Sequence, residues 1–212
     1  MAIPTTAQVG DALEHAPEKF TAFVALCAFG GLRLGEAAGL QVCDINFMRR
    51  EVHVQRQAQL VTGGTVDTSR APKFGSERTV YIPEELVQML SKHVRLHAPG
   101  DDSERWMFPG DGEYPLHQNS AGYLWTKTRD KAGVRFRLHD LGHYFASGLI
   151  AAGCDVVTVQ RAMGHGSPSF TLNTYSHLWP KAEDRTRNAA AQMFTEALTA
   201  DRVPDPVAIN AP

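Results

Sequence analysis

The spacing of apolar residues changes twice along this chain, and no other feature constrains the fold as strongly. Toward both ends of the sequence, apolar residues recur at the spacing of amphipathic helices. Residues 51–61 instead alternate apolar and polar side chains, Gly63 and Gly64 offer a hairpin turn, and residues 76–83 form another short run that contains strand-forming residues and ends at a proline. The pattern predicts an α+β fold that is mainly helical, with a small three-stranded antiparallel sheet inserted after the first helices.

Capping residues, prolines and glycines bound the helical segments. Thr5 or Thr6 can cap the first helix, and Gly30 with Gly31 ends the second. We expect helices over residues 7–16, 19–29, 33–41, 84–98, 119–132, 138–153, 155–164 and 180–200. Residues 169–178, SFTLNTYSHL, are expected to be a polar connection between two helices.

The composition is that of a globular protein that needs no covalent or metal cross-link. The chain has 212 residues, of which 43% are hydrophobic and 21% charged. Its cysteines, Cys27, Cys43 and Cys154, are odd in number and far apart, which argues against a disulfide framework and favours a reducing, cytoplasmic location. No apolar run approaches the ~20 residues that span a bilayer. We therefore expect one domain over residues 1–200, a loose tail over 201–212 and no membrane partner.

Charge is unevenly distributed, although the formal net charge is only −2. Residues 49–83 carry six basic and three acidic groups and residues 114–187 carry nine and five, whereas residues 84–113 carry three and seven. Two basic segments separated by an acidic one permit a positive face on a nearly neutral molecule. Such a face suits a polyanionic partner, although ordinary solvated surfaces would give the same counts.

An arginine and a lysine occupy positions suited to binding an anion. Arg33 follows Gly30 and Gly31 at a helix start, where backbone amides and a guanidinium can converge on a phosphate. Glu36 lies three residues further on and offers Arg33 a structural ion pair instead. Lys73 lies in a turn between strand candidates, where its ammonium can serve as a point charge or a proton donor, or can simply be solvated.

Histidines gather in the last third of the sequence. His139 and His143 are four residues apart on one predicted helix, and His165 follows in the segment MGHGSPS. The first pair could bind a metal ion, but no glutamate lies between the two as in the HExxH motif. We predict no metal site, and a histidine-ligated metallohydrolase is kept as a competing hypothesis.

Tyr175 lies in the expected polar connection, so its phenol should be more exposed than that of a core tyrosine. A phenol with a pKa of about 10 is a poor nucleophile unless fixed cations hold and neutralise its target. Attack on a phosphodiester also needs a general base for the phenol and a general acid for the departing hydroxyl. Arginine, lysine and histidine side chains meet those needs, whereas a lone tyrosine is more often a packing residue.

Four segments of this chain follow one another in a specific order: GLRLGEAAGL, APKFGSERTVYIP, LHDLGHYFASGLIAAG and MGHGSPSFTLNTYSHL. Together they resemble the catalytic domain of tyrosine recombinases, the phage integrase family, over nearly the whole chain. That family opens its site with Arg-x-x-Glu, places a lysine on a strand-turn, continues with His-x-x-Arg-His and Gly-His, and ends with the nucleophilic tyrosine. The resemblance implies site-specific DNA recombination, as in phage integration and excision, through a phosphotyrosine intermediate and without a metal or other cofactor.

The resemblance implies which residues would bind the scissile phosphate. Arg33 would clamp the phosphate, and Glu36 would steady the site from behind. His165 would donate a hydrogen bond to a phosphate oxygen.

It also implies a path for the protons. Tyr175 would be the nucleophile and His139 its nearby proton acceptor. Lys73 would be the general acid for the leaving 5′ hydroxyl. His143 would support these groups or be purely structural.

One position departs from the family pattern. Where the family has its second arginine, this chain has Gly142. A glycine inside a helix costs about 1 kcal/mol relative to alanine, so helix stability does not account for it. Loss of one phosphate clamp predicts a severely impaired enzyme, since one oxyanion-hole donor is worth about 3–4 kcal/mol. Natural decay or a deliberate substitution would leave the same glycine, and the intact remaining motif favours the second; rescue by Arg135 or Arg137 is the less favoured alternative.

The expected partners also follow from the resemblance. They are double-stranded DNA attachment sites, a homotetramer on DNA with a monomer in its absence, and accessory DNA-bending or directionality factors. The family's N-terminal core-binding domain is expected to be missing from this chain, and the helix over 180–200 is expected to pack on its own domain or on a neighbouring protomer. On DNA the protein would be associated with the host nucleoid. Candidate phosphate contacts, each of which could equally be an ordinary surface residue, are Arg70, Arg78, Lys127 and Arg161.

Besides the metallohydrolase, two alternatives to an active or impaired integrase are open. A catalytically inactive module of recombinase ancestry would bind DNA or assemble with active protomers without cutting. A type IB topoisomerase shares the phosphotyrosine chemistry, but the short spacing of the motifs here is closer to that of integrases.

Overall fold

The computed structural model describes residues 3–61, 65–68, 71–72, 76–110, 112–180 and 182–200. The helices are α1 Thr6–His15, α2 Glu18–Phe29, α3 Leu34–Ala38, α4 Glu84–His97, α5 Gln118–Ala132, α6 Asp140–Ala151, α7 Val156–Met163, α8 Pro168–Tyr175 and α9 Ala182–Ala200. The strands are β1 Ile45–Asn46, β2 Glu51–Val54, β3 Gln59–Leu60, β4 Val66–Asp67 and β5 Arg78–Tyr81. The predicted class, mainly helical with a small antiparallel sheet, is confirmed.

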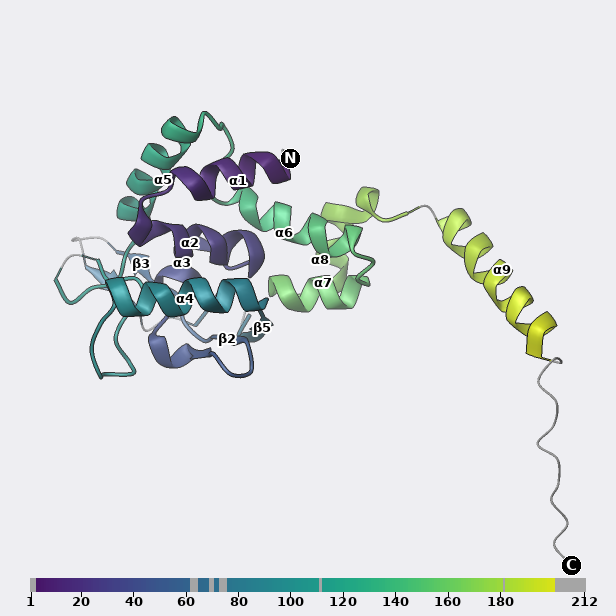
Figure 1. The fold of residues 1–212 in the computed structure, drawn as a ribbon, viewed down its shortest axis with the longest axis horizontal. Coiled ribbons are helices and arrows are strands. Elements are labelled where there is room, and N and C mark those ends of the chain that lie inside the picture. The colour runs from purple at the N-terminus through teal and green to yellow at the C-terminus, as the bar shows by residue number, and fades with distance from the viewer. Residues whose placement is uncertain are drawn as a thin grey trace, which may run out of the picture. The chain divides into compact units, whose positions relative to one another are not determined.

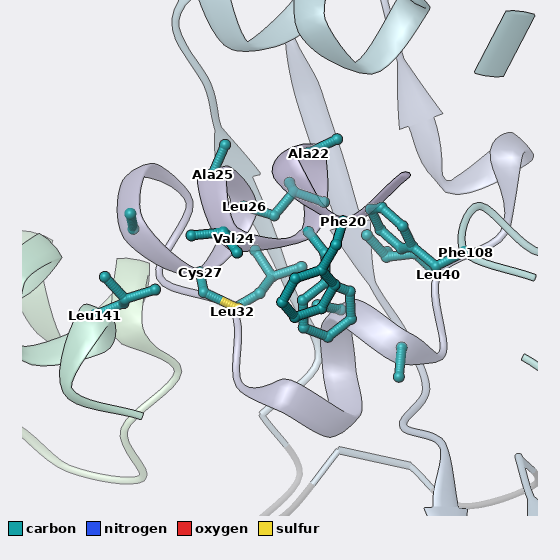
Figure 2. Close-up of a cluster of buried hydrophobic side chains, with 14 of the residues drawn as sticks. Phe20, Ala22, Val24, Ala25, Leu26, Cys27, Leu32, Leu40, Phe108 and Leu141 are labelled. Carbon is teal, nitrogen blue, oxygen red and sulfur yellow. The ribbon is translucent and has the colours of Figure 1, made fainter. Parts of the chain in front are cut away.

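Helix α2 forms the centre of the hydrophobic core. It lies between α1 and α4, and its C-terminal end meets α6 (Figure 1). Its sequence, EKFTAFVALCAF, is apolar on nearly every face, as expected for a helix surrounded by protein. Phe20 and Leu26 are fully buried, and Figure 2 shows them in one cluster with Phe108 and Leu141 from other elements. The rigid end of α2 therefore fixes where the chain emerges toward Arg33.

The turn that follows α2 depends on a glycine, Gly31. Gly31 has φ +64°, a left-handed conformation that glycine adopts without a Cβ clash. A Cβ at this position would lie 2.5 Å from a ring carbon of Phe145 on α6. The turn after α2 is consequently packed tightly against α6, which carries two of the candidate histidines.

The three-stranded antiparallel sheet has the order β1–β2–β5, with Val52 opposite both Ile45 and Val80. Its first strand, β1, lies before the alternating run that was expected to supply the sheet, which begins at residue 51. The alternating run over 51–61 does not continue as one strand, because the backbone leaves the sheet after Val54 and forms β3, which pairs with β4. Between β2 and β3, the amide of Ala58 donates to Gly35 O of α3 at 2.8 Å, so this part of the run is bonded to a helix and not to the three-stranded sheet.

Two of the secondary-structure predictions need correction, one for a connection and one for a helix. Residues 169–178 are not a polar connection, because α8 covers most of them and ends at Tyr175. Ser167 caps α8 by accepting a hydrogen bond from the amide of Phe170, and Pro168 follows at the first helical position. The helix expected over 33–41 is shorter than predicted and ends at Ala38.

The contacts divide the chain into one compact unit that ends at Ser176 and a second unit that begins at His177 and contains α9. Within the second unit Met193, Phe194 and Leu198 are each more than 60% exposed. Among the described residues no helix is long and apolar enough to cross a membrane.

Candidate active site

A cavity of about 250 Å³ lies between the turn after α2 and helices α6, α7 and α8. The predicted site residues that line it are Arg33, His139, Gly142, His143, His165 and Tyr175. They come from segments more than one hundred residues apart in sequence. The structure thus brings together most of the predicted set, whereas Lys73 and Arg70 fall outside the described residues.

Arg33 precedes α3 and reaches across to α7. Its backbone amide donates to Glu36 Oε2 at 2.9 Å, and its Nη1 donates to Glu36 Oε1 at 2.7 Å. Its Nη2 donates to the carbonyls of Met163 and Gly164 at 3.3 and 3.1 Å. The side chain is 30% exposed, so one edge of the guanidinium still faces the cavity and can meet an anion.

Glu36 lies behind Arg33 and is 1% exposed. Burial opposes its ionisation, but hydrogen bonds and charge from Arg78, and then the charge of Arg33, outweigh burial and hold the pKa of this carboxyl below its usual value. Arg78 pairs with Glu36 at 2.9 Å and is itself only 7% exposed. In this structure the guanidinium of Arg78, a predicted phosphate contact, is turned into the protein and pairs with Glu36.

Tyr175 is 1% exposed, which corrects the expectation of an accessible phenol. Its hydroxyl lies 2.7 Å from His143 Nδ1. Burial raises the pKa of Tyr175 to about 12, and burial followed by the charge of His139 lowers the pKa of His143. A neutral imidazole can accept the phenolic proton, so the two groups form a matched donor and acceptor.

The histidine next to the phenol is His143 and not the expected His139. His139 does not contact the phenol, because it is the N-cap residue of α6 and is exposed. His143 lies one helical turn deeper, and the two imidazole rings meet edge to face with centroids 5.3 Å apart. The HxxxH spacing predicted that both histidines lie on one face of the helix. Only His143, one turn further from the exposed N-terminal end, is close enough to contact Tyr175.

His165 follows α7 and faces the same cavity. Its Nδ1 lies 2.8 Å from the hydroxyl of Thr171, a fully buried residue of α8 that the sequence analysis did not identify. Burial, and then the charges of Arg33 and Arg78, lower the pKa of His165 to about 4. The ring is therefore neutral at pH 7 and stacks near Tyr175, with centroids 6.4 Å apart.

Gly142 lines the cavity in the first turn of α6. A Cβ built there would have one neighbour within 4 Å, Met163 Cε at 3.6 Å, which is an ordinary contact. Arg137 does not take the place of a missing arginine, because its guanidinium pairs with Asp140 at 2.8 Å and is 75% exposed. Arg135 is exposed.

The other candidate DNA contacts lie on the surface. On the exposed face of α5, Lys127 Nζ lies 4.5 Å from the ring centroid of Tyr123. Arg161 is exposed on α7 and lines a polar groove with Thr79 and Tyr81 beside the cavity. The described segments contain no group of three or more His, Cys, Asp or Glu residues placed to hold a metal ion, so a metallohydrolase gains no ligand set from the structure.

A search against known families decides the ancestry of this site. The phage integrase family matches residues 5–181. The chain belongs to the phage integrase family. The resemblance found in the ordered motifs is thereby confirmed, and the integrase match spans every element of the compact unit described above.

Individual relatives agree with the family match. The chain is 30% identical over 191 residues to a tyrosine recombinase XerC-like protein of Caldanaerobacter subterraneus, covering 80% of this chain and 48% of the relative. It is 30% identical over 163 residues to tyrosine recombinase XerA of Thermococcus onnurineus, covering 74% and 51%. The chain thus spans about half the length of these integrase relatives.

Solved structures show the same fold. The Tn1549 transposon integrase in complex with transposon right end DNA superposes with a TM-score of 0.74 at 21% identity, covering 92% of this chain and 66% of that one. The XerA recombinase gives 0.66 at 19% identity, covering 91% and 63%. The fold is that of tyrosine recombinase catalytic domains.

Proposed function

We propose that this chain is the catalytic domain of a site-specific DNA recombinase that cleaves and rejoins DNA through Tyr175. The observation that carries the proposal is the convergence of Arg33, His165 and the Tyr175–His143 pair on one cavity. An arginine and a neutral histidine suit a phosphodiester, and a phenol paired with a base suits nucleophilic attack on it. Membership of the phage integrase family supports the same reaction.

In the first step the scissile phosphate exchanges its bond to the 5′ oxygen of DNA for a bond to the oxygen of Tyr175. The oxygen of Tyr175 attacks phosphorus, and its proton passes to His143 Nδ1. The bond from phosphorus to the 5′ oxygen breaks, and Lys73 protonates the departing 5′ oxygen. Arg33 neutralises a nonbridging oxygen. His165 Nδ1 lies 2.8 Å from the Thr171 hydroxyl. In the tautomer in which Nδ1 accepts that hydrogen bond, the ring carries its proton on Nε2, and this N–H donates a hydrogen bond to the phosphate.

The second step reverses the first with a different nucleophile. A 5′ hydroxyl of another strand attacks the phosphotyrosine, and its proton passes to Lys73. The bond from phosphorus to the Tyr175 oxygen breaks as His143 returns a proton to that oxygen. The covalent link keeps the energy of the broken bond, so neither step consumes ATP. His139 lies at the outer end of the His139–His143–Tyr175 series and passes the proton from His143 to solvent.

Gly142 leaves this clamp one guanidinium short. The family pattern has an arginine at this position, and the cavity beside Gly142 is open at the Cβ. Because Asp140 holds Arg137, the nearest arginine along the helix is already committed. We infer that this chain cleaves DNA slowly, because it lacks several kcal/mol of transition-state stabilisation. The loss should be similar to that of one oxyanion-hole donor, about 3–4 kcal/mol.

The partner is double-stranded DNA at attachment sites. Related structures, including XerH bound to its difH substrate, are complexes with DNA. We propose phosphate contacts by Lys127 and Arg161, a homotetramer on DNA in which the exposed apolar side chains of α9 pack on a neighbouring protomer, and a monomer without DNA. We further propose that Arg70 contacts a DNA phosphate and that accessory bending or directionality factors take part. The reaction would take place in the cytoplasm, at the nucleoid.

Covalent trapping on a nicked attachment-site DNA tests this function. The parent chain, Gly142→Arg, and Gly142→Arg with Tyr175→Phe are compared by denaturing gel. We expect a protein–DNA adduct in Gly142→Arg, little or none in the parent, and none once Tyr175 is replaced. An adduct that survives Tyr175→Phe would refute the assigned nucleophile.

A second candidate is a DNA-binding and assembly module that does not cut. Gly142 and the burial of Tyr175 favour it, because both lower the reactivity of the site. DNA binding without an adduct in any variant, Gly142→Arg included, would select this alternative.

A further inference from the structure

The guanidinium of Arg78 is hydrogen-bonded on all sides by groups of the protein itself. Arg78 begins β5, and its Nε donates to Ala162 O at 3.0 Å. Its Nη1 donates to Glu36 Oε1 at 3.1 Å and Ser76 O at 3.3 Å, and its Nη2 donates to Glu36 Oε2 at 2.9 Å and Gly31 O at 3.3 Å. A guanidinium has five N–H groups, so this one is fully used inside the protein.

These bonds join three segments that the sequence keeps far apart. They link the start of β5, the turn from Gly31 to Glu36, and the C-terminal end of α7. Arg33 donates to the next two carbonyls of α7, those of Met163 and Gly164. Together the two guanidiniums satisfy carbonyls that a helix C-terminus leaves free, where positive charge is also favoured.

The backbone then passes directly over Arg78 into His165. Gly164 has φ +61°, and a Cβ there would lie 2.7 Å from Arg78 Nη1. This close approach places the Arg78 guanidinium directly against the backbone that leads into His165. The same guanidinium holds both oxygens of Glu36, which in turn holds Arg33.

We propose that Arg78 is a positioning residue that sets the spacing of Arg33 and His165 for a shared phosphate. It acts through Glu36 and the end of α7 and does not touch DNA. The inference rests on the proposed phosphotransfer, and it replaces the surface role that the sequence suggested for Arg78.

Lysine at this position separates geometry from charge. Arg78→Lys keeps one positive charge beside Glu36 but has three donors on one atom instead of a planar set of five. Misplacement of about 1 Å at such a site can cost on the order of 100-fold in rate. We therefore expect Arg78→Lys to slow adduct formation by about that factor, while DNA affinity changes by no more than about twofold.

The experiment uses Gly142→Arg as the reference and adds Arg78→Lys or, as a matched control on the exposed side of α4, Arg95→Lys. Single-turnover adduct formation on nicked DNA gives the rate, and binding measured across salt concentrations gives the affinity and its salt slope. We expect Arg78→Lys to lower the rate alone, and the control to leave the rate within about twofold. Circular dichroism melts establish that each variant is folded at the assay temperature.

Three results overturn the inference. An unchanged rate in Arg78→Lys shows that its geometry is dispensable, and a loss of DNA affinity well beyond twofold identifies a direct phosphate contact. If the reference forms no Tyr175-dependent adduct, the proposed function fails, and amide exchange then decides the inference about Arg78. The His165 amide, which donates to Gln160 O at 3.0 Å, should exchange faster in Arg78→Lys, and unchanged protection refutes the positioning role.

Discussion

Replacement of Glu36 by glutamine should destabilise the fold strongly. The carboxylate is 1% exposed and accepts hydrogen bonds from both Arg33 and Arg78. Removing one partner from a buried ion pair leaves uncompensated charge and typically costs about 3–5 kcal/mol. For a protein of this size each kcal/mol lowers Tm by about 2–4 °C, so Glu36→Gln should lower Tm by roughly 6–20 °C.

Glu18→Gln is the matched control. Glu18 forms an ion pair with Lys92 at 3.2 Å, but the two side chains are 62% and 59% exposed. An exposed pair contributes about 0–1 kcal/mol, so the same carboxylate-to-amide change should lower Tm by no more than about 4 °C. The contrast isolates the effect of burial from that of the chemical change.

The assay is thermal unfolding of the parent and both variants, repeated from pH 7 to pH 3. Because the folded pKa of Glu36 lies below its unfolded value, its stabilisation is complete above about pH 4.3 and is lost as the pH falls through the folded pKa. The Tm difference between parent and Glu36→Gln should therefore narrow only at the acid end. Equal melting shifts for Glu36→Gln and Glu18→Gln at pH 7 would refute the buried-anchor argument.

Two further predictions concern helix α6. Gly142→Ala should raise Tm by about 1–4 °C, because alanine gains about 0.5–1 kcal/mol in a helix and its Cβ meets Met163 at an ordinary 3.6 Å; a lower Tm in differential scanning fluorimetry would contradict this. Adduct formation by Gly142→Arg should fall with acid along a limb whose midpoint lies below pH 6.5, because burial lowers the pKa of the acceptor His143; a midpoint above 6.5 in the rate profile would exclude His143 as the acceptor.

Local patterns were sufficient to predict the helical framework. The apolar run of α2, the capping threonine of α1 and the proline that precedes α4 each act within a few residues, so their positions were predicted closely. Helix α8 escaped detection because Thr171, Asn173 and Thr174 interrupt its apolar period. Its cap, Ser167 followed by Pro168, was the signal that a reader of the sequence could have used.

Which residues gather at the site could be predicted from the sequence, but how deeply each one is buried could not. Motif order identified Arg33, His165 and Tyr175, because each residue type is dictated by phosphate chemistry. Whether Tyr175 is exposed, and which histidine reaches it, depends on how α6 and α8 pack, and no local pattern encodes that contact. Arg78 shows the same limit, since its burial arises from bonds to residues more than forty positions away in both directions.

Charge balance in the cavity suggests what an arginine at position 142 would require. Glu36 already pairs with Arg33 and Arg78, and Asp140 pairs with Arg137, so these neighbouring carboxylates have no free capacity. A new guanidinium would face Arg33 without a partner, and a phosphate would supply one. Gly142→Arg should therefore gain more Tm from inorganic phosphate than the parent does, because a ligand stabilises the state that binds it more tightly. Equal gains in the two proteins, measured at constant ionic strength, would place the side chain of residue 142 outside the phosphate site.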